Sequence, residues 1–425
     1  MRIIKVLGCL FFISFHVSAV DVSAHKTKQM NIIVASLGDD THDMREIAET
    51  IERDLSFTGQ FDPKNIRFQQ LKTTKQVLSF NDQAPLFVTL IDDRKNKAVE
   101  WRAYNTKTGK MVCGKKVHKI GEKVFEWGHA VSDSLLLELT GNQASFSTKI
   151  LYCKEGGKKK QGTEICIADF DGHNEQIILS LDSIALAPRW NGKTLDPLIL
   201  YSEYTASNIR LMVSDLKGNK QIATSFDGLN MLPAFSEDGS DVIVCLSVEG
   251  SSQLYRYKYN KRKKRPDYIR LTHNNGTNLS PNLRENGDIV FCSDYETKRP
   301  HIYTMNKQGK NITCLSQGPE SCTSPSYSIT TKKVVYSKLI GGVSQLMVYD
   351  FETQKTTQIT RDNKHKEEAS WSPCGNYLIF TVCDSATKRL AVESLLTKKR
   401  NYITGTTHKY TYATCSPGRL FLAKS

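Results

Sequence analysis

The segment Pro233-Ala234-Phe235-Ser236-Glu237-Asp238-Gly239 decides the fold, because versions of its first three residues recur along the last two-thirds of the chain. Each version has a Pro or another small residue, then an aromatic or apolar anchor two places later. Successive anchors lie 45, 48 and then three times 44 residues apart. A period near 44 with short alternating segments is typical of one four-stranded blade, so the sequence predicts a β-propeller. The versions are Pro188-Arg189-Trp190, Pro233-Ala234-Phe235, Pro281-Asn282-Leu283, Pro325-Ser326-Tyr327, Ala369-Ser370-Trp371 and Ala413-Thr414-Cys415.

The two ends of this repeat region predict how the ring closes. Residues 148–180 supply three short apolar strands with no anchor strand ahead of them. The last anchor strand, at 412–416, has no third or fourth strand after it. Together these segments make one blade shared between both ends, which seals the ring without an open edge. We therefore expect a six-bladed all-β propeller over residues 146–425.

Residues 31–141 lack the repeat and mix strands with two helices. Ile47, Ile51 and Leu55 recur at helical spacing, and a second apolar stripe runs from Val124 to Leu139. Apolar strands are expected at 31–35 and 85–91, with a hairpin around Gly109. These patterns predict a small α/β domain over 31–141, ahead of the propeller.

The N-terminus reads as an export signal. Arg2 and Lys5 precede an apolar stretch, and Val17-Ser18-Ala19 supplies the small residues of a cleavage site. A second Val-Ser-Ala ends at Ala24, so cleavage is open between 19 and 24. We expect a signal peptide over 1–19, a flexible tail over 20–30, and an exported protein with no membrane span.

Basic residues outnumber acidic ones, and the formal net charge of the whole chain is +14. Several turns between third and fourth strands are basic, so one rim of the ring is expected to be positive. A docking site for an anionic surface and ordinary solvated turns are both compatible with this pattern. Export argues against nucleic acid as the partner. The candidate anionic-surface residues are Lys261, Arg262, Lys263, Lys264 and Arg265.

Motifs of catalysis and metal binding are missing from the sequence. It contains no G-x-S-x-G elbow, H-E-x-x-H, phosphate-binding loop or C-x-x-C, and its histidines are scattered. We therefore expect no catalytic residue, no metal and no cofactor. Predicted strands contain Cys166, Cys245, Cys292, Cys383 and Cys415, which favours buried thiols, although one or two disulfides are possible in an oxidising compartment.

The links between blades lie on the face opposite the basic turns and surround the mouth of the central channel. They are polar with isolated apolar residues, which suits recognition of a protein partner.

Several local segments resemble the TolB family over about residues 31–418. The most specific ones are Ser56-Phe57-Thr58-Gly59-Gln60-Phe61, His129-Ala130-Val131-Ser132-Asp133, Leu139-Thr140-Gly141, Phe146-Ser147-Thr148-Lys149-Ile150, Asp169-Phe170-Asp171-Gly172 and Pro233 to Gly239. The resemblance implies a non-enzymatic periplasmic adaptor of the Tol–Pal system, monomeric, that binds the lipoprotein Pal and TolA. Such an adaptor associates with the outer membrane only through its partners, maintains outer-membrane integrity and aids constriction at cell division.

The resemblance also assigns candidate contact residues. Val20, Asp21 and Val22 would belong to a TolA-binding tail, although the tail differs in sequence from the usual family form. The Pal-like contacts also depart from the family pattern, with apolar or small residues where polar ones are typical. The alternative function is a propeller hydrolase or lyase acting on a glycan or cell-wall fragment in the channel. The Pal-like contacts are Leu229, Asn230, Met231, Leu232, Asn278, Leu279, Ser280, Ser324, Glu367 and Glu368.

Overall fold

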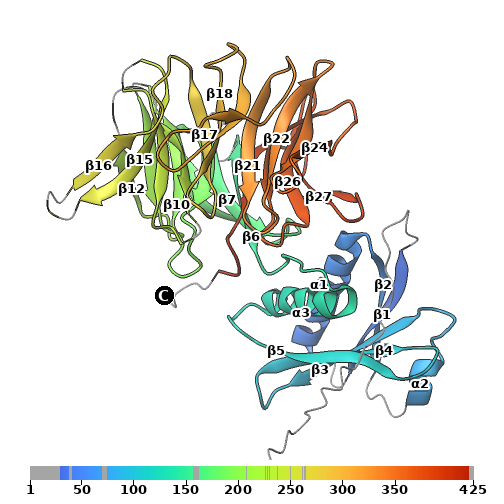
Figure 1. Cartoon of the computed structure of the whole chain (residues 1–425). Helices are drawn as coiled ribbons and strands as arrows, with labels where there is room; N and C mark the ends of the chain where they lie inside the picture. Colours follow the sequence, from blue (N-terminus) through green and yellow to red (C-terminus); the bar gives the residue numbers. More distant parts are fainter. Residues whose placement is uncertain are drawn as a thin grey trace, which may run out of the picture.

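A computed structural model shows two parts, an α/β part and a ring of six sheets (Figure 1). The predicted fold class is confirmed. The predicted signal peptide and most of the tail, including Val20, Asp21 and Val22, lie outside the described residues. Within the described chain, no helix is both long and apolar enough to cross a membrane. The structure describes residues 29–37, 41–68, 74–156, 162–206, 208–224, 226, 228, 230–236, 238–248, 250–260, 262 and 265–420.

The α/β part is a five-stranded sheet in the order β2-β1-β3-β4-β5. β1 runs parallel to β2 and β3, and the other neighbours are antiparallel. Alternate residues of β1 face two different cores, with Ile32 and Val34 on one side and Ile33 and Ala35 on the other. The elements are β1 (Met30–Leu37), α1 (His42–Thr58), β2 (Phe61–Phe68), α2 (Thr74–Leu78), β3 (Leu86–Asp93), β4 (Ala98–Asn105), β5 (Met111–His118) and α3 (Val124–Thr140).

Both predicted helices are confirmed, and their ends follow from local chemistry. Thr41 caps the start of α1, where its hydroxyl accepts a hydrogen bond from the Met44 amide at 3.3 Å. Gly59 and Gly141 end α1 and α3 in the left-handed conformation, with φ of 73° and 71°. β2 and α2 were not predicted. β2 carries Pro63 and four polar or charged residues, which an edge strand tolerates but which hide its periodicity.

The ring consists of six four-stranded antiparallel sheets, each with its first strand innermost. The first three complete blades are β9 (Ile184–Trp190), β10 (Ile199–Tyr204), β11 (Ile209–Ser214) and β12 (Lys220–Thr224); β13 (Asn230–Phe235), β14 (Val242–Leu246), β15 (Gln253–Asn260) and β16 (Arg265–Arg270); and β17 (Asn278–Leu283), β18 (Ile289–Ser293), β19 (His301–Met305) and β20 (Thr313–Cys314). The next two are β21 (Cys322–Ser328), β22 (Lys333–Ile340), β23 (Val343–Asp350) and β24 (Lys355–Gln358); and β25 (His365–Trp371), β26 (Tyr377–Cys383), β27 (Lys388–Ser394) and β28 (Arg400–Tyr402).

The sixth blade combines β29 (Lys409–Cys415) with β6 (Lys149–Glu155), β7 (Thr163–Asp169) and β8 (Gln176–Leu181). β29 pairs antiparallel with β6 from Lys409 opposite Glu155 to Cys415 opposite Ile150. The Ser416 amide extends the pairing to the Lys149 carbonyl at 2.8 Å. The predicted blade shared by both ends of the propeller is therefore confirmed.

We call the face that carries the links between blades the link face, and the opposite face the turn face. The α/β part packs against the turn face, beside the closing blade and its neighbour (Figure 1). Four aromatic rings fill this contact in edge-to-face pairs. Phe146 lies 5.9 Å from Phe57 and 5.6 Å from Phe170, and Phe170 lies 5.4 Å from Tyr377. One apolar core thus runs through both parts.

A buried charge network joins the two parts beside these rings. His129 on α3 contacts Asp54 of α1 through Nδ1 at 2.9 Å and Asp169 at the end of β7 through Nε2 at 3.4 Å. All three side chains are at most 1% exposed. Burial lowers the pKa of His129, but the charges of Asp54 and Asp169 and hydrogen bonds to both outweigh it and raise the pKa to about 10. At neutral pH the imidazolium therefore bridges the two parts.

The turn between β27 and β28 satisfies the carbonyl end of α1. The Thr397 hydroxyl donates to the Thr58 carbonyl at 2.8 Å, and Lys399 Nζ donates to the Ser56 carbonyl at 2.5 Å. Asn401 Nδ2 donates to the Phe57 carbonyl at 2.9 Å. The Ser56 carbonyl also accepts from the amide of the capping Gly59 at 3.2 Å. The last carbonyls of a helix carry the negative end of its dipole, so a cation is favourable here. Lys399 belongs to one of the basic turns between third and fourth strands, and the structure shows that its ammonium contacts α1.

We predict that His129→Asn lowers the free energy of unfolding by about 3–5 kcal/mol, because two buried aspartates lose their shared counter-charge. His173→Asn is the matched control. His173 also pairs with an aspartate, Asp171, at 3.0 Å, but its side chain is 56% exposed. Its loss should cost at most about 1 kcal/mol. Urea unfolding followed by tryptophan fluorescence measures both, and equal small losses would contradict the bridging role.

We predict a pH dependence from the same group. The raised pKa means that the stabilisation by His129 is complete below its usual pKa of about 6.5 and is lost as pH rises toward about 10. Between these values the free energy of unfolding should fall more steeply for the natural protein than for His129→Asn. Parallel curves for the two proteins across this window would show that His129 is neutral in the folded state.

Candidate functional site

The central channel is lined by the six innermost strands. Its described lining encloses a cavity of about 330 Å³ that extends to turn-face residues such as Ser328 and Pro373. The residue before each anchor lines this cavity. These six residues are mostly small and polar, with one guanidinium. The six residues are Arg189, Ala234, Asn282, Ser326, Ser370 and Thr414.

Each innermost strand carries a β-bulge at the same place, toward the link face. The strand pairing shifts register there in all six blades. The bulged residue has a left-handed backbone although it is not glycine, a conformation that costs about 1–2 kcal/mol. A Pro or Ala follows each of them, which explains the repeated motif. The six residues are Ala187 (φ 51°), Leu232 (52°), Ser280 (51°), Ser324 (53°), Glu368 (57°) and Tyr412 (57°).

Four of these bulged residues, Leu232, Ser280, Ser324 and Glu368, are among the predicted Pal-like contacts. The structure brings them together around the link-face mouth of the channel because the bulge recurs in every blade. Ala187 and Tyr412 occupy the same place in the other two blades and were not predicted. The sequence could have identified both, because each lies directly before the Pro or Ala of its repeat, as the four predicted residues do.

Asn230 and Asn278 are fully buried, and each lies two positions before the bulged residue of its strand. Asn278 Nδ2 donates to the Ser252 and Gly276 carbonyls at 3.3 and 3.1 Å and to Asn274 Oδ1 at 2.9 Å. Asn230 holds its own link in the same way, through the Ile209 and Phe226 carbonyls. Both side chains hold the link from inside. Because they are buried, they can affect partner binding only by supporting the surface residues of the link.

Lys366 takes the equivalent place in the fifth complete blade and is also fully buried. Its ammonium donates to the Asp362 carboxylate and, at 2.6 Å, to the Lys364 carbonyl. Asp362 also accepts from Arg400 Nη1 at 2.7 Å. The Lys366 ammonium therefore donates to a link carbonyl, as the asparagine amides do in other blades, and the Asp362 carboxylate offsets its buried charge.

The remaining predicted contacts on the link face are half-buried. Met231, Leu232 and Leu279 pack against the core shared by the second and third complete blades. Glu368 accepts hydrogen bonds from the Thr381 hydroxyl at 2.9 Å and the Tyr412 amide at 2.8 Å, and burial raises its pKa. Ser280, Ser324 and Glu367 are half-buried as well. Leu229 lies outside the described residues.

The basic turn predicted as an anionic-surface site is described only in part. Lys261, Lys263 and Lys264 lie outside the described residues. Arg262 is exposed, and Arg265 begins β16, where its backbone pairs with Asn260.

One group of described side chains has metal-ligand geometry. The donor atoms of Asp54, His129 and Asp171 lie within 4.8 Å of one another. They do not fit a metal, because cationic side chains already hold them: Arg53 Nε lies 3.3 Å from Asp171, and His129 is itself charged between two aspartates. All ten described cysteines are free, and eight of them are buried, which agrees with the prediction of buried thiols.

Comparison with known proteins gives a consistent result. Residues 137–418 match the family described as the TolB β-propeller domain. A crystal structure of TolB from Acinetobacter baumannii superimposes with a TM-score of 0.77 at 20% identity, covering 92% of this chain and 97% of that one. At this identity the superposition supports the fold, including the α/β part.

Among curated relatives, the Tol-Pal system protein TolB of Francisella tularensis subsp. mediasiatica is 29% identical over 261 residues. That of subsp. holarctica has the same identity over the same length. The matched region covers 59% of this chain and 59% of each relative.

We predict that Asn278→Ala lowers the free energy of unfolding by about 1–3 kcal/mol, because several buried carbonyls lose their donor. The matched control is Ser280→Ala, two residues along the same strand and half-buried, with an expected change within about 0.5 kcal/mol. Thermal unfolding by circular dichroism measures both. A larger effect of Ser280→Ala would place the organising contact at the bulge instead of the buried asparagine.

Proposed function

Because the chain belongs to the TolB β-propeller family, we propose that it is a periplasmic adaptor of the Tol–Pal system. In this role it binds a Pal-like lipoprotein through the link face of its propeller. It associates with the outer membrane through that partner and has no catalytic step. TolA would engage the N-terminal tail around Val20, Asp21 and Val22. The system so assembled would keep the outer membrane attached and support constriction at division.

The single observation that supports this best is the fixed ring of bulged residues around the link-face mouth. Buried Asn230, Asn278 and Lys366 hold the links from inside, so the surface is built before a partner arrives. Half-buried Met231, Leu232 and Leu279 add apolar area within a polar surround, as in the centre of many protein interfaces. A surface that is rigid before binding loses little conformational entropy on binding.

The alternative function, a hydrolase or lyase acting in the channel, receives less support. Glycosidic cleavage and related reactions need paired carboxylates or metal ligands that converge on the substrate. Among the described residues that line the cavity, none is acidic and none is a histidine. Glu368 lies near the channel, but its carboxylate is already hydrogen-bonded to Thr381 and Tyr412.

We predict that the mature protein, added to cross-linked envelope extract, recovers a Pal-like lipoprotein that mass spectrometry identifies. Leu232→Asp and Ser280→Arg should reduce the recovery at least about tenfold, since each places a charge at the centre of the proposed interface. Leu279→Arg should act in the same direction.

Lys307→Asp is the matched control, because it changes an exposed charge on the turn face, in the turn between β19 and β20. It should leave recovery unchanged. All variants must melt within a few degrees of the natural protein. Full recovery by well-folded link-face variants, or loss only in Lys307→Asp, would place the partner on the turn face instead.

A further inference from the structure

The cavity in the channel has one feature that adaptor binding at the link face does not use. Of the 23 described residues that line it, Arg189 alone carries a charge. The others are Trp, Tyr, Pro, Gly, Ser, Thr, Asn, Cys and apolar residues. In the other five blades, the residue equivalent to Arg189 is Ala, Asn, Ser, Ser or Thr. The positive charge is therefore a local departure from a neutral ring.

Few of the hydrogen-bond donors of the Arg189 guanidinium have an acceptor within the described chain. Its one hydrogen bond to a described residue runs from Nη1 to the carbonyl of the neighbouring Pro188 at 3.1 Å. No described carboxylate forms an ion pair with it within 4.0 Å. Glu368 is a nearby acidic group, and its Oε2 already accepts from Thr381 and Tyr412. A guanidinium has five N–H donors in a planar fork, so most of its donors remain for another partner.

The residues around Arg189 are suited to an organic anion. The hydroxyls of Ser326 and Thr414 line the cavity and make no hydrogen bond to another described residue. Trp190 and Trp371 also line it, and their indole N–H groups are tied to the Thr414 and Ser326 carbonyls at 3.4 and 2.9 Å. Both indoles are largely buried in the cores of their blades, so each presents only a small part of its surface to the cavity. The cavity combines one cation, free hydroxyls and apolar walls.

We propose that the channel is a carboxylate-binding site, in which Arg189 holds the carboxylate of a small organic acid or the terminal carboxylate of a peptide. A carboxylate matches the guanidinium fork in charge and in bidentate geometry. Ser326 and Thr414 add donors, and the apolar part of the lining contacts the apolar body of the ligand. A volume of about 330 Å³ falls within the range of small-ligand sites.

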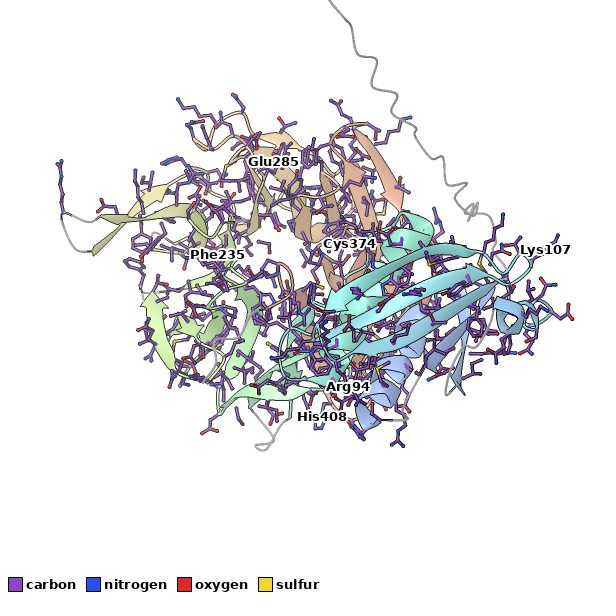
Figure 2. The ribbon with its side chains drawn as sticks, turned by 90° about the horizontal axis from the view of Figure 1, so that it is seen from below. Arg94, Lys107, Phe235, Glu285, Cys374 and His408 are labelled. Carbon is purple, nitrogen blue, oxygen red and sulfur yellow. The ribbon has the colours of Figure 1, made fainter. Side chains whose placement is uncertain are left out.

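The site is reached from the turn face. Its lining includes Ser236, Ser328 and Ser372, each of which directly follows or ends an innermost strand on that side. Figure 2 views this side, and Phe235, which lines the cavity, lies in the part of the ring that the α/β part leaves uncovered. A ligand in the channel and a partner on the link face would therefore enter from opposite ends.

The test is a calorimetric titration of the mature protein with the peptide N-acetyl-Ala-Ala-Phe bearing a free carboxylate. The same peptide with a C-terminal amide, and sodium acetate, are separate arms. We expect saturable binding of the acid and at least tenfold weaker binding of the amide. Acetate binding as tight as the peptide would support the site with a small organic acid as its ligand. Absence of saturable binding by both carboxylates would overturn the proposal.

Variants then locate the binding. Arg189→Met should weaken carboxylate binding at least tenfold, whereas Lys217→Met, an equal loss of charge on an exposed turn, should leave it unchanged. Thr414→Val provides a second probe with nearly the same volume and should weaken binding about threefold or more. If Arg189→Met melts early, the Thr414→Val result decides. Unchanged affinity in well-folded Arg189→Met, or in Thr414→Val if Arg189→Met does not fold, would overturn the proposal.

Discussion

The antiparallel pairing of β29 with β6 is the contact on which the rest of the structure depends. The pairing places Cys415 opposite Ile150, so the last strand of the propeller sequence is bonded to the first. Neither end of the propeller is then left with an open strand edge between blades. The blade that it closes also carries Asp169 at the end of β7, and Phe170 and Asp171 in the turn after it, where the α/β part docks. Ring closure and the attachment of the α/β part are therefore properties of one blade. Loss of this pairing would therefore open the ring and also disturb the blade on which the α/β part packs.

A second consequence of the closed ring is that each innermost strand has its free edge toward the channel. The repeated bulge, with its following Pro or Ala, interrupts the regular pairing of each innermost strand with the second strand of its blade. Three positions of one five-residue stretch have different roles. The first residue is buried and holds the link, the third is the bulged residue at the link face, and the fifth lines the cavity directly before the anchor. One repeat thus builds the proposed partner surface and the channel wall at the same time. Asn278, Ser280 and Asn282 show this division within a single strand.

The sequence was sufficient to predict what repeats or alternates locally. The six anchors, the shared blade and the two long helices each follow from spacing within a few dozen residues. It did not predict contacts between residues far apart in the chain, because no local pattern records them. His129 meets Asp54 and Asp169 only after the two parts dock, and Lys399 reaches the end of α1 across more than 300 residues. The buried state of Asn230 and Lys366 was missed for the same reason, since polar residues in a link ordinarily indicate exposure.

We propose that the link face binds an exported lipoprotein partner. Hydrogen–deuterium exchange of the mature protein, with and without that lipoprotein, tests it most directly because it maps the contact without a substitution. We expect slower exchange at the link-face ends of β13, β17, β21 and β25, with the turns between first and second strands unchanged. Protection confined to the turn face, or to the α/β part, would contradict it.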